Sequence, residues 1–100
     1  MVVLDRAKED LFDGYAFYEK QQPGIGDYFF DSISSDIDSL LIHHGFHRNV
    51  FGLHRLLAKT FPFSIYYRIV DETIFIDAVL AQRGNPKSIR DLLRRRSRPE

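Results

Sequence analysis

Alternating apolar positions between residues 61 and 83 predict two strands joined by a short turn. Every second position of the first run is apolar, which places one set on a single face of a strand: Phe63, Ile65, Tyr67 and Ile69. The second run repeats the alternation with Ile74, Ile76, Ala78 and Leu80. Residues 71–73 separate the two runs, which is a length typical of a hairpin loop. Because a two-stranded hairpin is marginally stable alone in water, other elements must cover it.

Two upstream segments have the spacing of amphipathic helices. The first is expected from Asp5, as N-cap, to about Gln21, before the Pro23-Gly24 pair, with an apolar stripe of Ala7, Leu11, Tyr15 and Tyr18. The second is expected over residues 26–42, with the stripe Ile25, Phe29, Ile33, Ile37 and Leu40. The short connection predicts antiparallel neighbours that cover one face of the sheet, with Ile33 and Ile37 buried against it.

Further strands are expected at both sides of the hairpin. Val2–Leu4 form a stub that suits a short edge strand, and a second strand is expected near residues 53–59. Arg55 and Lys59 fall on one face of that strand. The positions that oppose the apolar set of the hairpin are Ser64, Tyr66, Arg68, Phe75, Asp77 and Val79. One sheet face is therefore predicted to be apolar and covered by helices, and the other to be mixed and able to bind a partner.

The chain closes with a predicted basic helix. Asn85 suits the N-cap and Pro86 the first helical position. Its apolar positions, Ile89, Leu92 and Leu93, are expected to dock the helix and to leave the arginines facing outward: Arg90, Arg94, Arg95, Arg96 and Arg98. The alternative is a solvated tail whose cations only favour the helix C-terminus.

Composition and charge place limits on the function. The chain of 100 residues is expected to be one α+β domain, residues 1–100, with a net charge of zero. Residues 1–45 hold nine acids and three bases, whereas residues 46–100 hold five acids and eleven bases. The basic half suits an acidic partner or nucleic acid, or else the two halves neutralise each other. There is no cysteine, apolar run of membrane-spanning length or signal-peptide pattern, so a cytoplasmic protein without membrane contact is expected.

The sequence contains few groups that could carry catalysis or bind a cofactor or metal. The sequence has no glycine-rich phosphate loop, zinc motif or nucleophile elbow, and no cofactor is expected. His43, His44 and His47 invite a metal site, but Gly45 interrupts their helix and no carboxylate has ligand spacing, so none is predicted. A set of cations could bind phosphate and stabilise charge during RNA cleavage: Arg55, Lys59, Arg68 and Arg83.

Several stretches, taken in order, resemble one protein family. FPFSIYY is followed by IDAVLAQR and then by NP, and upstream lie AKEDL, YAFYEKQQPGIGDYF and LHRLLAKTFPF. This order is similar to the RelE/ParE superfamily of toxins from bacterial type II toxin–antitoxin pairs, in its ParE-like branch. The resemblance implies a helical hairpin packed on a small, mainly antiparallel sheet, and a plasmid-stabilisation type of system. It also implies inhibition of growth, a cognate antitoxin as partner and DNA gyrase as target.

The RelE-type relatives offer the main alternative. They cut messenger RNA on the ribosome with Arg and Lys on this sheet, and with a Tyr or His near the end of the chain. Here the last Tyr is Tyr67 and the last His is His54, and no such group follows Arg83. The sequence therefore predicts a non-enzymatic inhibitor, with an endoribonuclease using Arg55, Arg68 and Arg83, or a degenerate binding module without toxicity, as alternatives. The predicted contact residues for target or antitoxin are Arg55, Lys59, Tyr66, Arg68, Arg83, Arg90, Arg94 and Arg95.

Overall fold

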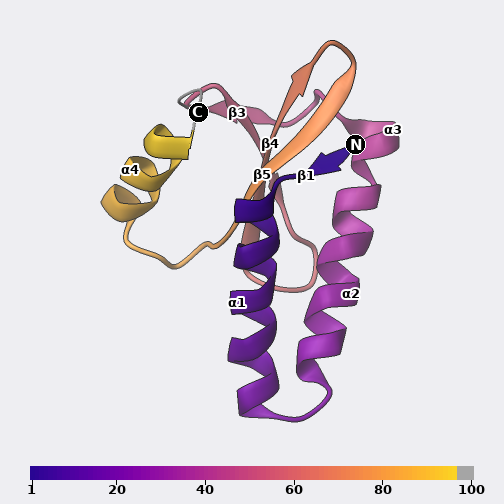
Figure 1. Cartoon of the computed structure of the whole chain (residues 1–100), viewed down its shortest axis with the longest axis vertical. Coiled ribbons are helices and arrows are strands. Elements are labelled where there is room, and N and C mark those ends of the chain that lie inside the picture. Colours follow the sequence, from indigo (N-terminus) through magenta and orange to yellow (C-terminus); the bar gives the residue numbers. More distant parts are fainter. Residues whose placement is uncertain (97–100) are drawn as a thin grey trace.

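A five-stranded sheet separates a helical hairpin from a single basic helix (Figure 1). The structure is a computed structural model that describes residues 1–96. The sheet order is β1-β5-β4-β3-β2, with β1 parallel to β5 and the other pairs antiparallel. The strands are β1 (Val2–Val3), β2 (Arg48–Val50), β3 (Leu53–Leu57), β4 (Phe63–Val70) and β5 (Thr73–Ala81). The helices are α1 (Asp5–Gln21), α2 (Ile25–Asp38), α3 (Leu40–His43) and α4 (Pro86–Arg96). The predicted α+β architecture is confirmed.

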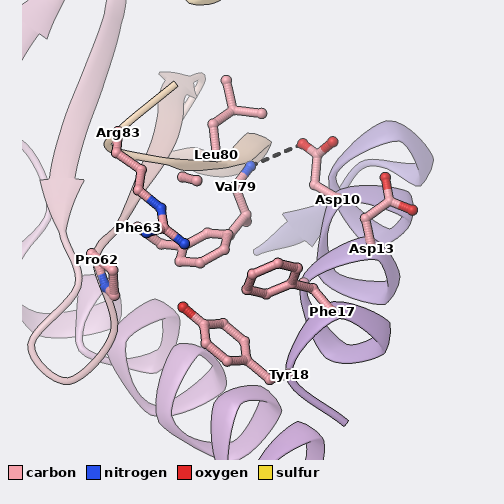
Figure 2. A pocket seen from close by; sticks show the side chains of 11 residues that line it. Asp10, Asp13, Phe17, Tyr18, Pro62, Phe63, Val79, Leu80 and Arg83 are labelled. Carbon is pink, nitrogen blue, oxygen red and sulfur yellow. Dashed lines mark hydrogen bonds between the residues drawn. The ribbon is translucent and has the colours of Figure 1, made fainter. Parts of the chain in front are cut away.

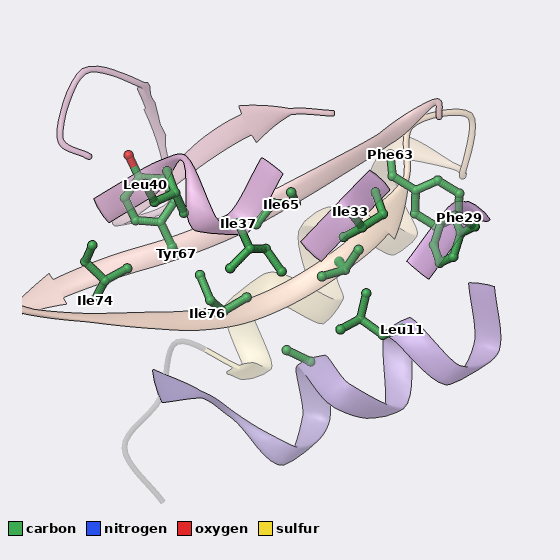
Figure 3. Close-up of a cluster of buried hydrophobic side chains, with 12 residues drawn as sticks. Leu11, Phe29, Ile33, Ile37, Leu40, Phe63, Ile65, Tyr67, Ile74 and Ile76 are labelled. Atoms are coloured by element: carbon green, nitrogen blue, oxygen red, sulfur yellow. The ribbon is translucent and has the colours of Figure 1, made fainter. Parts of the chain in front are cut away.

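Helices α1 and α2 cover one face of the sheet with the apolar stripes that the sequence predicts (Figure 3). Ile33 is fully buried and Ile37 is 5% exposed, so both predicted core positions are confirmed. An aromatic group fills the end of the core nearest the α1–α2 turn. The ring centroids of Phe29 and Phe63 lie 4.9 Å apart, and those of Tyr18 and Phe61 4.8 Å apart. Such edge-to-face and tilted pairs add to the apolar area that burial removes from water.

The helix boundaries differ from the sequence prediction at two points. The N-cap of α1 is Leu4 rather than Asp5, and no side chain caps this end. The second predicted helix is interrupted at Ser39, so that Leu40–His43 form the separate α3. The Ser39 hydroxyl donates a 2.6 Å hydrogen bond to the carbonyl oxygen of Asp36. Such back-bonding competes with the backbone ladder and favours a bend in the helix.

A β-bulge at Asp77 changes which face the second half of β5 presents. Tyr67 pairs with Ile76 and Tyr66 with Ala78, so Asp77 has no partner in the register. One extra residue reverses the alternation beyond it, because side chains change face at every step. The predicted face is therefore right for Ile76 and wrong for Ala78: Val79 joins the core under α1 and α2, and Ala78 and Leu80 pack on the α4 side.

Strand β2 was not predicted, and the strand expected over residues 53–59 ends at Leu57. A two-residue turn joins β2 to β3, with Phe51 at φ 53° and Gly52 at φ 79°. The main hairpin has a similar turn, and Thr73 belongs to β5 rather than to the loop. Positive φ at both central residues gives the twist that antiparallel neighbours need.

A hydrogen-bonded network fixes the loop after α3 to the sheet. The Tyr67 hydroxyl accepts the backbone N–H of Gly45 at 3.0 Å and lies 2.6 Å from Nδ1 of His47. The His54 ring stacks on Tyr67 with centroids 5.0 Å apart, and its Nδ1 lies 3.1 Å from the carbonyl oxygen of His47. The Tyr67 hydroxyl has one proton to donate, and a neutral His47 with Nδ1 unprotonated can accept it.

This network predicts that stability falls at mildly acidic pH. Burial, followed by the neighbouring His54 and His43, lowers the pKa of His47. The unfolded chain then binds a proton more readily than the folded one, so stability is present above the ordinary histidine pKa of about 6.5 and is lost as pH falls below it. Urea unfolding from roughly pH 7.5 to 5.5 should show a falling midpoint, with a smaller slope in His47→Gln. An equal slope in both proteins would contradict this role.

Candidate functional site

Helix α4 covers the second face of the sheet through a small apolar contact. Leu93 is 1% exposed and packs with Leu53, Tyr66 and Ala78, and Ile89 lies at the margin of the same cluster. The predicted docking role is thus confirmed for Leu93, while Leu92 is only half-buried. Since so few apolar side chains hold α4, its ends need other contacts.

The start of α4 agrees with the predicted cap. The Asn85 Oδ1 atom accepts the backbone N–H of Lys87 at 2.9 Å and lies 3.5 Å from that of Ser88. Pro86 is the first helical residue, where its missing N–H costs nothing.

The end of α4 is held by a bidentate ion pair. The Arg96 guanidinium donates to the two carboxylate oxygens of Asp10 at 2.6 and 3.1 Å, and to the carbonyl oxygen of Asp77 at 3.3 Å. The hydrogen bonds to Asp10 raise the pKa of Arg96 above its ordinary value. Arg6 in turn donates to the Arg96 carbonyl oxygen at 2.7 Å. The prediction that all arginines of this helix face outward is therefore wrong for Arg96, which docks the helix.

The bulge residue Asp77 is the buried anion to which this region is tied. Its side chain is fully buried, with one carboxylate oxygen 2.6 Å from Arg6 Nη2 and the other 3.6 Å from Arg68 Nε. A buried carboxylate is costly unless opposite charges compensate it. Arg68, predicted as a site residue, thus has a structural role in neutralising Asp77.

A groove of about 440 Å³ runs between α4 and the β2–β3–β4 side of the sheet. Its polar lining combines Arg55 and Arg90 with Ser64, Tyr66 and Gln82. Its apolar lining is made by Val50, Phe51, Leu57, Ile89 and Leu93, and Gly84 and Pro86 complete it. Three predicted contact residues, Arg55, Tyr66 and Arg90, therefore meet here.

Two arginines stand opposite each other beside the groove. Arg48 of β2 pairs in register with Arg55 of β3, so their side chains share one face. Like charges in directly opposed positions destabilise a sheet. Arg55 Nε is also buried without a hydrogen bond to any residue among 1–96. An anionic group bound in the groove would screen the repulsion between the two guanidinium groups, because it would place an opposite charge beside both.

The β2–β3 turn places an aromatic ring at the rim. Phe51 is a bulky residue with positive φ, a strained conformation, and the residue is 43% exposed. The Asn49 side chain supports the turn by accepting the Gly52 N–H at 3.1 Å. The Arg94 guanidinium lies over the Phe51 ring at 5.5 Å, which is a cation–π geometry. The rim therefore offers an exposed aromatic surface next to positive charge.

The remaining predicted residues lie elsewhere. Arg83 lines a second pocket, beside α1, and Lys59 lies in the β3–β4 loop, where its backbone N–H donates to Asp36 at 3.2 Å. The four cations Arg55, Lys59, Arg68 and Arg83 thus do not line one pocket. Arg95 is exposed on α4, and Arg98 lies outside the described residues.

Sequence reasoning missed Phe51, which lines the groove, and Arg48, which pairs with the groove residue Arg55. The signal that could have found them is Phe51-Gly52, since a glycine in a two-residue turn indicates a hairpin. Recognition of that hairpin would have placed Arg48 opposite Arg55 by counting outward from the turn.

Residues 1–96 contain neither a cluster of metal ligands nor a helix of membrane-spanning character. No group of three or more His, Asp or Glu side chains there is arranged to hold a metal ion. Within the same range, no helix combines the length and the apolar character needed to cross a bilayer.

Fold and site together define a small α+β domain with an arginine-lined groove under its C-terminal helix. No protein-family model matches the chain, and no curated protein matches it. Among solved structures, a chain of the structure described as "Chromosomal ParDE TA system from P. aeruginosa" has the same fold, with a TM-score of 0.72. The two sequences are 23% identical over 81% of this chain and 95% of that one. The fold expected from the resemblance is thus confirmed.

Proposed function

We propose that this protein is the toxin of a type II toxin–antitoxin pair of the ParE type. The observation that carries the proposal is the shared fold with a chain of the ParDE system over most of both chains. The order of sequence motifs, from AKEDL to IDAVLAQR and NP, supports the same assignment. A cytoplasmic location and a plasmid-stabilisation type of system belong to this proposal.

We further propose that the groove beside α4 is the surface that meets the cellular target, and that the target is DNA gyrase. The opposed Arg48 and Arg55 and the rim residue Phe51 are costly to the fold, and such costs concentrate at functional sites. An arginine-lined groove with an aromatic rim is suited to a partner surface rich in carboxylates.

Induction of this chain alone in a bacterial host is expected to stop growth, and co-expression of the antitoxin encoded in the adjacent reading frame to restore it. Purified protein is expected to inhibit DNA supercoiling by gyrase in vitro. Growth arrest with normal supercoiling would reject gyrase and retain the toxin. Normal growth after induction, with the protein present and folded, would reject the toxin assignment.

The same purified protein is expected to leave translated messenger RNA intact. Primer extension on a message under translation measures this, with an Arg55→Ala variant for comparison. Arg55 is a better choice than Arg68, because Arg68 also neutralises buried Asp77. Codon-specific cuts that disappear in Arg55→Ala would favour the RelE-like endoribonuclease instead.

A further inference from the structure

A second pocket, of about 330 Å³, lies between α1 and the open end of the β4–β5 hairpin, where β4 begins and β5 ends (Figure 2). Aromatic rings make its walls: Phe17 and Tyr18 come from α1, and Phe63 from the start of β4. Phe17 is 48% exposed, so a large apolar surface remains in contact with water here. The other lining residues are Asp10, Asp13, Gly14, Pro62, Val79, Leu80, Ala81 and Arg83.

Some polar side chains of this pocket already form hydrogen bonds or ion pairs within the protein, and others do not. Asp10 is engaged, because its carboxylate accepts the Val79 N–H at 3.0 Å and the guanidinium of Arg96. Arg83 is exposed and makes no hydrogen bond or ion pair with any residue among 1–96. In Figure 2 its side chain extends towards Phe63, and the Tyr18 hydroxyl points into the hollow. The pocket thus offers a guanidinium and a phenol beside an apolar floor.

These features restrict the ligand. One guanidinium suits one carboxylate, because the two pair through matched donors and acceptors. Asp10 and Asp13 on the α1 side disfavour a phosphate, which carries more negative charge and needs more donors. The aromatic walls favour an apolar group attached close to that carboxylate.

We propose that this pocket binds an apolar side chain of the antitoxin, with a carboxylate of the same segment paired to Arg83. The identity of the occupant rests on the proposed function, whereas the chemistry of the pocket does not. A segment with a carboxylate next to an apolar side chain provides both groups, and its carboxylate complements Arg83, the one base among the described residues that line the pocket. The pocket is distinct from the groove beside α4, so the antitoxin and the target would meet separate surfaces.

The chemistry is tested with 3-phenylpropionate as probe, followed by NMR of the isotopically labelled protein. Amide signals of Gly14, Val79 and Ala81 are expected to shift. The neutral 3-phenylpropanamide is expected to bind at least about tenfold more weakly, as is 3-phenylpropionate to Arg83→Gln, since each change removes a charge-assisted pair. Arg90→Gln is the matched control, because it removes the same charge from the α4 groove. Absence of shifts at the pocket, or equal binding of acid and amide, would overturn the proposal.

The occupant is tested with the antitoxin that restores growth. It is expected to displace 3-phenylpropionate from the pocket and to bind Arg83→Gln about tenfold more weakly than Arg90→Gln. Simultaneous binding of antitoxin and probe would show that the antitoxin uses another surface. If no product of an adjacent reading frame binds the protein, the proposed function fails. The 3-phenylpropionate experiment still determines whether the pocket binds an apolar carboxylate.

Discussion

Replacing Arg55 and Arg90 together with glutamine is expected to restore growth after induction while the protein stays folded. Both side chains line the groove beside α4, and each contributes one positive charge to it. A charge-assisted hydrogen bond contributes about 1.5–3 kcal/mol, so loss of two should weaken target binding by at least about a hundredfold. The measurement is colony formation after induction, with urea unfolding to establish that the variant is folded.

The free energy of unfolding of the Arg55→Gln, Arg90→Gln variant provides a second test. Arg55 stands opposite Arg48, so its replacement relieves repulsion and should leave stability unchanged or raise it by a few tenths of a kcal/mol. A matched control removes two charges from α1, Lys8→Gln with Lys20→Gln, on the other side of the sheet. If the control restores growth as well as the groove variant does, net charge and not the groove determines toxicity.

The sequence alone suggests a different experiment, the removal of Arg94, Arg95 and Arg96 together. The structure shows that this set mixes two roles, because Arg96 docks α4 on Asp10. Arg94→Gln with Arg95→Gln, which leaves Arg96 in place, tests whether the outer face of the helix contributes to toxicity. Full toxicity of this pair would show that Arg95, and Arg94 over the Phe51 ring, are not needed for target contact, and would leave Arg55 and Arg90 as the contact residues.

Ile37→Ala is expected to lower the free energy of unfolding by about 2–5 kcal/mol, as truncation of a buried isoleucine does. Ile37 is 5% exposed in the core between α2 and the sheet, and Ile33 beside it is fully buried. Ile42 offers a matched control, since it is 76% exposed on α3. The same substitution there should change stability by less than about 0.5 kcal/mol. Equal unfolding midpoints for Ile37→Ala and the parent would contradict the packing of α2 described above.

Periodicity determined the elements whose hydrophobic pattern is long and regular. The stripes of α1 and α2 and the alternation in β4 each repeat over several positions, so the pattern indicates both the element and its buried face. The cap at Asn85 was equally readable, because a side chain bonds to the backbone only two and three residues away. Each of these depends on contacts near in sequence or on burial of one continuous face.

Tertiary structure decided the features that depend on one inserted residue or on partners far apart in the chain. The bulge at Asp77 reversed the faces of Ala78 and Val79, and alternation alone cannot locate such a residue. Arg96 and Asp10 are 86 positions apart, so no local pattern distinguishes this arginine from its exposed neighbours on α4. Contacts between distant parts of the chain also form the groove, since Arg55 and Arg90 meet only when α4 packs across β3 and β4. The sequence by itself thus determined the layers of this protein, and long-range ion pairs and one bulge decided which charges remain available to a partner.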